Sequence, residues 1–350
     1  MGIFDEERRK TAEDTLRAAG PGTLAFVFVT DSHLSDSGED TWENIHAVDN
    51  TVGYRFVLHG GDFLNGCNPP KLTARLYGEE AAAYAASIRS NKLFPVQGNH
   101  DGYRDETYLR QSVSEAKPDP WYHNITRFVD AYPETVRHGD DPYYYADFQD
   151  VKVRLAVMCS MEYTFDPSTK DYRHWFGMRQ DQIDWFCGEV LSLPAGWTLL
   201  VCSHVQPVSV HLHDIMEGGL PEKGGLEFAE LLAAVNRKDR IHAFGRDFDF
   251  TECGFDVACL IYGHVHGDCD RGYRELPMIT TASQTAYVPQ LWDMEIGGFP
   301  SPRTVGEVSQ DCWDSVVLDP GTKTISFFRF GAGEDRVIQY DGFREDRQWN

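Results

Sequence analysis

The chain has 350 residues, of which 41% are hydrophobic and 25% are charged, so it is long enough to bury a large core. Its formal net charge of −23 argues against a protein that follows the phosphate backbone of nucleic acids, because such binding needs a basic groove. A local cation site could still attract a small anion, so the acidity does not exclude phosphate chemistry.

No stretch approaches eighteen consecutive apolar residues, and the charged N-terminus lacks the apolar core of a signal peptide. The eight cysteines are scattered, form no CxxC pair, and in several cases lie inside apolar runs. We therefore expect a cytoplasmic protein with reduced, buried thiols and no membrane segment. The oligomeric state is left open.

The predicted elements alternate between helices and apolar strands. Residues 1–23 are predicted as a polar, helical lead-in that stops at Gly20-Pro21-Gly22. Continuous apolar runs predict buried strands at 24–29, 55–58, 92–96, 197–202 and 257–261. Helices are predicted at 40–50, 71–90, 179–192 and 226–236. This alternation is typical of βαβ units in an α/β protein.

The remaining stretches complete a single predicted domain over residues 24–350. Strands at 143–148 and 151–158 are predicted to form a hairpin, and Asp319-Pro320-Gly321 predicts a second, C-terminal β-hairpin over 312–330. Insertions are predicted near 103–142, which is rich in proline, and near 205–250, which holds a glycine-rich loop. No internal repeat or long low-complexity linker divides the chain.

Polar residues with the chemistry of metal ligands follow five of the apolar strands. They are Asp31 and His33, Asp62, Asn99-His100-Asp101, His204, and His264 and His266. In βαβ sheets, ligands bind beyond the carboxyl ends of the strands, so we expect these residues at one edge of a sheet. Each one alone could be a turn former or a satisfied polar group. Their repetition at five strand ends predicts a functional site.

The spacing within these groups suits metal binding. In an extended segment, residues i and i+2 point the same way, so both members of a D-x-H or H-x-H pair can reach one ion cluster. Carboxylate, imidazole and amide oxygen together suit Mn²⁺, Fe²⁺ or Zn²⁺. About seven or eight side chains are too many for one tetrahedral ion, but they suit two ions about 3.5–4 Å apart that share a bridging carboxylate.

The ordered set D-x-H, G-D, G-N-H-D, a strand-end His and G-H-x-H resembles the calcineurin-like metallophosphoesterases over roughly residues 24–280. The resemblance implies a four-layer α/β/β/α sandwich of two mixed β-sheets flanked by helices, with a dimetal site at the carboxyl ends of the strands. It also implies hydrolysis of phosphate esters by a metal-bridging hydroxide.

The resemblance implies a role for each matching residue. One divalent ion would be held by Asp31, His33, Asp62 and His266, and Asp62 would bridge to a second ion completed by Asn99, His204 and His264. His100 would stabilise the transition state and protonate the leaving oxygen, and Asp101 is a candidate for orienting it. The ligand types do not choose between Mn, Fe and Zn.

The sequence departs from two branches of that family. Purple acid phosphatases carry a tyrosine ligand three residues after the bridging aspartate, where this chain has Asn65. The run Gly61-Asp62-Phe63-Leu64-Asn65-Gly66 also lacks the arginine and the orienting acid of the Ser/Thr protein phosphatases. Both branches are therefore disfavoured, and whether Asn65 or Asp101 orients His100 stays open.

Three further histidines are candidates for supporting roles. His59, which precedes Gly60-Gly61-Asp62, is a candidate for supporting the metal ligands or for a purely structural role. His211 and His213 follow the His204 loop and are candidates for contacting substrate.

The function predicted from the sequence is metal-dependent hydrolysis of a small phosphomonoester or phosphodiester. A nuclease or cyclic-nucleotide phosphodiesterase of the same fold is the main alternative, and the acidic charge disfavours nucleic acid. A catalytically inactive metal-binding scaffold and a structural component of an assembly are further alternatives. Substrate specificity is expected to lie in 103–142, 162–178 and 205–250.

Overall fold

The structure is a computed structural model of the chain. It describes residues 2–33, 38–64, 70–98, 100–101, 128–160, 177–208, 224–284, 303–304 and 306–345. Asn65, Asn99, His211 and His213 lie outside these described residues, as does most of the predicted insertion over 103–142.

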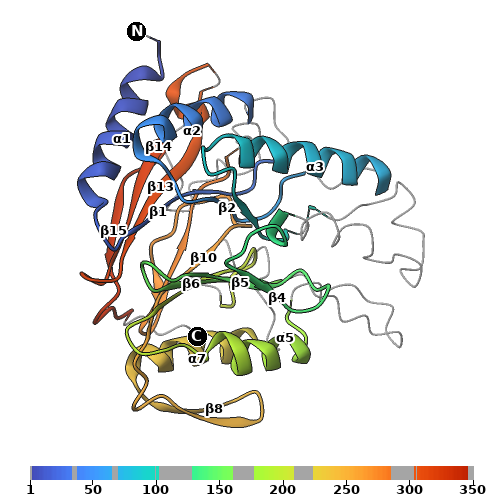
Figure 1. The fold of residues 1–350 in the computed structure, drawn as a ribbon, viewed down its shortest axis with the longest axis vertical. Helices are drawn as coiled ribbons and strands as arrows, with labels where there is room; N and C mark the ends of the chain where they lie inside the picture. Colours follow the sequence, from blue (N-terminus) through green and yellow to red (C-terminus); the bar gives the residue numbers. More distant parts are fainter. Residues whose placement is uncertain are drawn as a thin grey trace.

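Two β-sheets form the centre of the fold (Figure 1). The six-stranded sheet has the order β15 (Arg336–Gln339), β14 (Thr324–Gly331), β13 (Cys312–Asp319), β1 (Leu24–Val29), β2 (Val57–His59), β3 (Leu93–Pro95). The seven-stranded sheet has the order β11 (Gly272–Tyr273), β12 (Leu276–Thr280), β10 (Asp256–Tyr262), β7 (Thr198–Cys202), β6 (Val153–Val157), β5 (Tyr144–Phe148), β4 (Thr135–Arg137). Both sheets are mixed. In the six-stranded sheet, parallel strands occupy one side and antiparallel strands the other, whereas in the seven-stranded sheet antiparallel pairs lie at both edges of a parallel centre.

Helices cover the outer face of each sheet. The helices α1 (Asp5–Ala18), α2 (Gly38–Val52) and α3 (Pro70–Ala86) lie on the six-stranded sheet. The helices α5 (Gln180–Trp185) and α7 (Gly225–Arg237) lie on the seven-stranded sheet, and α5 continues as a π-helix over Phe186–Val190. The four layers confirm the predicted α/β/β/α sandwich.

The period of two along each strand divides the core into three layers. In β1, Phe26 and Phe28 face the other sheet, whereas Val27 and Val29 face the helices. Both faces of the strand are therefore buried, which is why its sequence is a continuous apolar run and does not alternate.

The C-terminal hairpin is part of the main sheet. Strand β13 pairs antiparallel with β1 from Leu24 opposite Leu318 to Phe28 opposite Asp314, and β14 and β15 extend the sheet beyond it. The sequence predicted the hairpin but not this pairing, because the two partners lie almost 300 positions apart. The division into a lead-in and one domain stays a prediction.

Several short strands were not predicted. They are β4, the pair β8 (Arg240–Ala243) and β9 (Arg246–Asp249), β11, β12 and β15. Strands β8 and β9 form a separate two-stranded sheet and are mostly exposed, so charged residues dominate their sequence and no apolar run marks them. None of the helices in the described ranges is long and apolar enough to cross a membrane.

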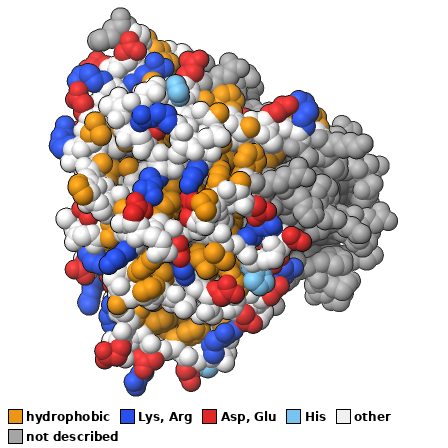
Figure 2. All heavy atoms as spheres, viewed as in Figure 1, with side chains coloured by type: hydrophobic (Ala, Val, Ile, Leu, Met, Phe, Trp, Pro, Cys, Tyr) orange, Lys and Arg blue, Asp and Glu red, His pale blue; other side chains and the backbone are white. Residues whose placement is uncertain are grey.

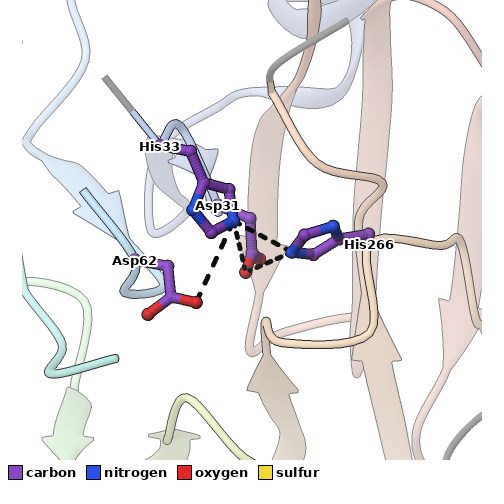
Figure 3. Close-up of side chains that lie close together, drawn as sticks. All are labelled: Asp31, His33, Asp62 and His266. Carbon is purple, nitrogen blue, oxygen red and sulfur yellow. Dashed lines mark hydrogen bonds and ion pairs between the residues drawn. The ribbon is translucent and has the colours of Figure 1, made fainter. Parts of the chain in front are cut away.

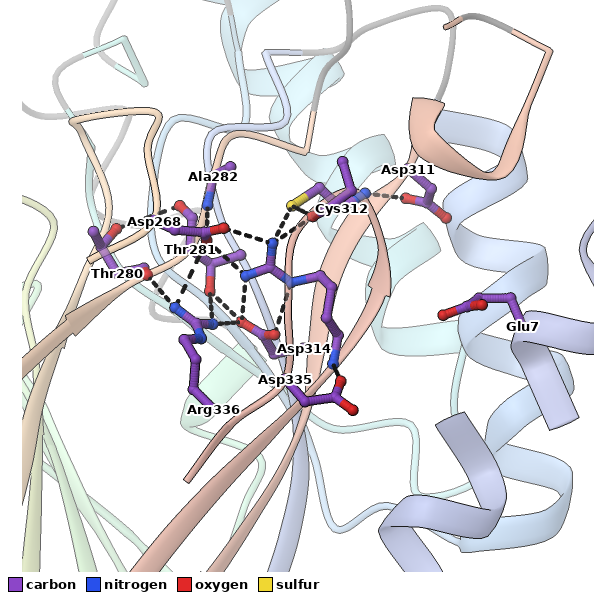
Figure 4. A network of polar contacts seen from close by, with 12 residues as sticks. Glu7, Asp268, Thr280, Thr281, Ala282, Asp311, Cys312, Asp314, Asp335 and Arg336 are labelled. Atoms are coloured by element: carbon purple, nitrogen blue, oxygen red, sulfur yellow. Dashed lines mark hydrogen bonds and ion pairs between the residues drawn. The ribbon is translucent and has the colours of Figure 1, made fainter. Parts of the chain in front are cut away.

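A buried ionic network joins β13 and β14 to the loop that follows β10 (Figure 4). Arg329, whose side chain is 2% exposed, donates from Nε to Asp314 (2.9 Å) and from Nη2 to Asp268 (2.6 Å). Asp268 also accepts the backbone N–H of Ala282 (3.1 Å). Arg336 completes the network by donating to Asp314. The network therefore fixes two loops that border the strand ends.

Replacing Arg329 with Met is expected to lower the free energy of unfolding by about 3–5 kcal/mol, because it breaks a buried ion pair and leaves Asp314 and Asp268 with Arg336 as their remaining cation. Chemical denaturation measures this change. The matched control is Arg55→Met, since Arg55 pairs with Asp150 at the surface, where the side chains are 44% and 57% exposed. The control should lose no more than about 1 kcal/mol. Equal, small losses in both variants would contradict the structural role of the network.

Candidate metal centre

The predicted ligands within the described ranges gather at the carboxyl ends of neighbouring strands. Asp31 and His33 follow β1, Asp62 follows β2, His204 follows β7, and His264 and His266 follow β10. Backbone hydrogen bonds join these strand ends, from Asp31 N to Gly61 O (2.9 Å) and from Gly263 N to His204 O (2.9 Å). The site therefore lies where the two sheets meet.

Four of these side chains converge on one point (Figure 3). One ligand atom from each of Asp31, His33, Asp62 and His266 lies within 4.8 Å of the other three. The Nε2 atoms of His33 and His266 are 3.0 Å apart, and Nε2 of His266 is 3.3 Å from Asp31 Oδ1. These residues are the set that the sequence resemblance assigned to one ion.

His204 and His264 form a second pair of imidazoles, and His204 meets the first group at Asp62. Asp62 Oδ2 is 3.3 Å from His204 Nε2 and 4.0 Å from His33 Nε2, so this one oxygen is close to an imidazole of each group. The rings of His204 and His264 are 5.3 Å apart in an edge-to-face arrangement.

Backbone carbonyls fix the orientation of two of the rings. His33 Nδ1 is 3.2 Å from Leu64 O, and His204 Nδ1 is 2.8 Å from Gly60 O. A carbonyl oxygen only accepts, so Nδ1 carries the proton in both rings, and Nε2, which faces the carboxylates, is the nitrogen that can bind a cation. This arrangement is the one in which histidines bind metal in proteins.

The buried charges divide the histidines into two kinds. Burial lowers the pKa of His33 to about 4 and that of His264 to about 3, so both are neutral near pH 7. Burial alone would also lower the pKa of His204, but the adjacent Asp62 carboxylate raises it to about 9. Asp31 likewise raises the pKa of His266 against the effect of burial. The two buried carboxylates thus stabilise positive charge on neighbouring groups, and divalent cations bound there could supply this charge in place of protons.

The backbone is in the left-handed region at five of the predicted ligands. The φ angles of Asp31, His33, Asp62, His264 and His266 lie between 48° and 72°. For residues other than glycine this conformation costs about 1–2 kcal/mol each, and such strain is concentrated at functional sites.

Close packing beneath the site explains two of the motif glycines. A Cβ atom at Gly98 would lie 2.1 Å from Asp62 Oδ1, and one at Gly263 would lie 2.2 Å from Thr30 Oγ1. Either substitution would displace a group at the centre of the site.

Asp101 binds the backbone of the loop that carries Asp62. Its Oδ2 accepts N–H groups from Asp62 (2.9 Å) and Gly98 (2.9 Å), and its Oδ1 accepts those of Phe63 (2.7 Å) and Leu64 (3.2 Å). Within the described residues, all of its hydrogen bonds go to the backbone and none goes to the His100 ring.

The His100 ring borders the cluster. Its centroid is 4.9 Å from that of His33, edge to face, and its backbone N–H donates to Asp62 Oδ1 (2.7 Å). The structure therefore brings together Asp31, His33, Asp62, His100, His204, His264 and His266, together with Asp101 beneath them.

Sequence reasoning missed three residues that support the turn carrying Asp31 and His33. Thr30 Oγ1 donates to Asp31 Oδ2 (2.6 Å), Ser283 Oγ donates to Asp31 O (2.7 Å), and Ser32 Oγ is 3.0 Å from His59 Nε2. Thr30 and Ser32 flank the ligand in sequence and could have been considered on that ground. Ser283 is more than 250 positions away, and no sequence signal marks it.

A family comparison agrees with this geometry. The sequence model of the calcineurin-like phosphoesterases matches residues 24–268. The chain belongs to the calcineurin-like phosphoesterase family. The match covers the strands that end in all of the candidate ligands and stops two residues after His266. No curated protein matches the sequence significantly.

Solved structures of this architecture resemble the chain at low sequence identity. A dimetal phosphatase from Danio rerio superposes with a TM-score of 0.53 and 14% identity, covering 91% of this chain and 99% of that one. The phosphopantetheinyl hydrolase PptH from Mycobacterium tuberculosis gives a TM-score of 0.40 and 10% identity over 79% of this chain and 94% of that one. At such identities the Danio rerio phosphatase supports the fold alone.

Replacing Asp101 with Ala is expected to weaken Mn²⁺ binding at least tenfold, because four buried N–H groups around Asp62 lose their acceptor. Isothermal titration measures the affinity, and Asp101→Asn, which keeps the volume, serves if the alanine variant does not fold.

Asp319→Ala is the matched control for this loss. Asp319 also accepts backbone N–H groups, from Gly321 (2.8 Å) and Thr322 (3.2 Å), but in an exposed turn away from the site. It should bind Mn²⁺ as the unmodified protein does. An Asp101 variant with unchanged affinity would show that its bonds do not support the site.

Proposed function

We propose that the chain hydrolyses small phosphate esters at a centre of two divalent ions. Family membership supports a phosphoester hydrolase. The observation that carries the proposal is the convergence of four ligand atoms, two carboxylate and two imidazole, within 4.8 Å of one another, on three buried residues and the half-buried His266.

The residues present fit the two ions. Asp31, His33, Asp62 and His266 would hold one of them, and Asp62, His204, His264 and Asn99 would hold the other. Ions bound there would lower the pKa of a water molecule and neutralise the charge of the phosphoryl oxygens. Mn, Fe and Zn all suit this donor set.

His100 is the proposed proton donor to the leaving oxygen. Its backbone is fixed by the bond to Asp62, and its ring lies against His33 at the border of the cluster. A substrate phosphate bound at the centre would therefore meet this imidazole at its edge, where a proton can pass to the departing alkoxide.

Asp101 is proposed to position the site without contacting substrate. Both of its carboxylate oxygens accept hydrogen bonds from backbone N–H groups, namely those of Asp62, Leu64 and Gly98, so Asp101 holds the Asp62 turn in place. Within the described residues it makes no hydrogen bond to the His100 ring, so we assign it no role in orienting that ring.

The charge distribution favours a small substrate over a nucleic acid. On the face seen in Figure 2, Lys and Arg side chains are interspersed with Asp and Glu and form no continuous basic band. With a net charge of −23, the protein would repel a long polyanion. A cytoplasmic location stays a prediction from the cysteine pattern.

The test compares phosphomonoesters with phosphodiesters on protein whose metal content is measured by elemental analysis. Chelation is expected to abolish hydrolysis of p-nitrophenyl phosphate or bis-p-nitrophenyl phosphate, and added Mn²⁺ should restore it. His100→Asn should lower kcat about 10²- to 10⁴-fold while the metal content is unchanged.

The control for His100 is His242→Asn. His242 is an exposed histidine that pairs with Asp247 on the β8–β9 hairpin, so its loss should leave kcat unchanged. If metal-replete protein hydrolyses no ester in the panel, the chain is a metal-binding scaffold and the proposed function is wrong.

A further inference from the structure

His59 is a fully buried histidine that lies directly beneath the metal centre. It ends β2, and its ring stacks on Phe63 with centroids 3.4 Å apart and planes inclined by 17°. The edge of Tyr84 packs against it from α3, with centroids 4.9 Å apart. The aromatic neighbours hold the plane of the ring, and its hydrogen bonds to Ser32 and Gly61 set the directions of its two nitrogens.

Both nitrogens are hydrogen-bonded, and the partners determine the position of the proton. Gly61 donates its backbone N–H to Nδ1 (3.2 Å), and a backbone N–H can only donate. Nδ1 therefore carries the lone pair, and Nε2 carries the proton, which it donates to Ser32 Oγ (3.0 Å). The ring is thus a bridge with one acceptor end and one donor end.

Each end of the bridge holds a turn that carries ligands. Ser32 lies between Asp31 and His33, and Gly61 directly precedes Asp62. Gly61 has a φ of 105°, and the three ligands have φ between 48° and 55°. The three ligands are therefore in a strained conformation that an unsupported loop would leave, whereas glycine adopts its positive φ freely. The His59 side chain adds a link between the two turns to the backbone hydrogen bonds from Asp31 N to Gly61 O (2.9 Å) and from His33 N to Asp62 O (3.0 Å).

We propose that His59 is a positioning residue that locks the Asp31–His33 turn to the Asp62 turn and thereby sets the affinity of the centre for divalent ions. The inference rests on the proposed function in that these turns are taken to hold metal. An apolar ring would fill the same space between Phe63 and Tyr84 without burying polar atoms. The two hydrogen bonds therefore explain why a histidine stands at this position.

The test measures Mn²⁺ affinity by titration and coordination by the visible spectrum of the Co²⁺-loaded protein. His59→Phe keeps the stacking and removes both bonds, and Ser32→Ala removes only the Nε2 bond. Loss of a partner that holds ligands in place weakens metal binding about 10- to 100-fold, and we expect His59→Phe to fall in this range with a changed Co²⁺ spectrum. The double variant should bind no more weakly than His59→Phe alone, because both changes break the same bridge.

Val48→Ala is the matched control for core packing. Val48 lies on α2 and is buried in the same core layer as Phe63 and Tyr84. Its side chain is apolar and forms no hydrogen bond with the ligand turns. It should lower thermal stability while Mn²⁺ affinity and the Co²⁺ spectrum stay those of the unmodified protein.

His59→Asn is the conservative variant. Its side-chain amide can accept the Gly61 N–H, so it should bind Mn²⁺ more tightly than His59→Phe does.

The outcomes separate this inference from the proposed function. Unchanged Mn²⁺ affinity in both Ser32→Ala and His59→Phe would overturn the role of His59 whether or not the protein hydrolyses esters. If His59→Phe does not fold, the conservative Ser32→Ala decides, since unchanged affinity in that variant alone contradicts the bridge. Protein that binds Mn²⁺ and responds to these changes but cleaves no phosphate ester would retain the inference and overturn the function.

Discussion

The site depends on holding five non-glycine residues in the left-handed backbone conformation around two buried carboxylates. Each residue carries a strain of about 1–2 kcal/mol, and the carboxylates and imidazoles crowd together at 3.0–4.0 Å. An isolated loop would relax out of this arrangement. The rest of the fold supplies the bonds that prevent it.

The hydrogen bonds that hold the cluster come from several different segments of the chain. Asp101 binds the Asp62 turn from below, His59 ties that turn to Ser32, and Ser283 holds the carbonyl of Asp31. The Arg329 network fixes the loops after β10 and β12 through Asp268. Polar residues buried at this edge are therefore explained as supports of a strained candidate metal site, because in an ordinary core they would only cost stability.

The sequence predicted what is encoded locally and missed what depends on distant pairing. Apolar runs such as 24–29 and 257–261 identified the buried strands, and the polar residues after them were correctly expected to gather at one edge, because strand ends in a parallel sheet meet there. The pairing of β13 with β1 has no local signal. Ser283 joins the site from more than 250 residues away, which periodicity and spacing cannot reveal. The ligand and catalytic roles of the predicted site residues stay predictions, and for Asn65, Asn99, His211 and His213 the positions also lie outside the described residues.

Anomalous diffraction from crystals of the protein loaded with Mn²⁺ tests the central claim most directly. The account predicts two peaks about 3.5–4 Å apart, with Asp62 between them. One peak should lie beside His33 and His266, and the other beside His204 and His264. A single peak, or peaks away from these strand ends, would contradict a two-metal centre built on this edge of the fold.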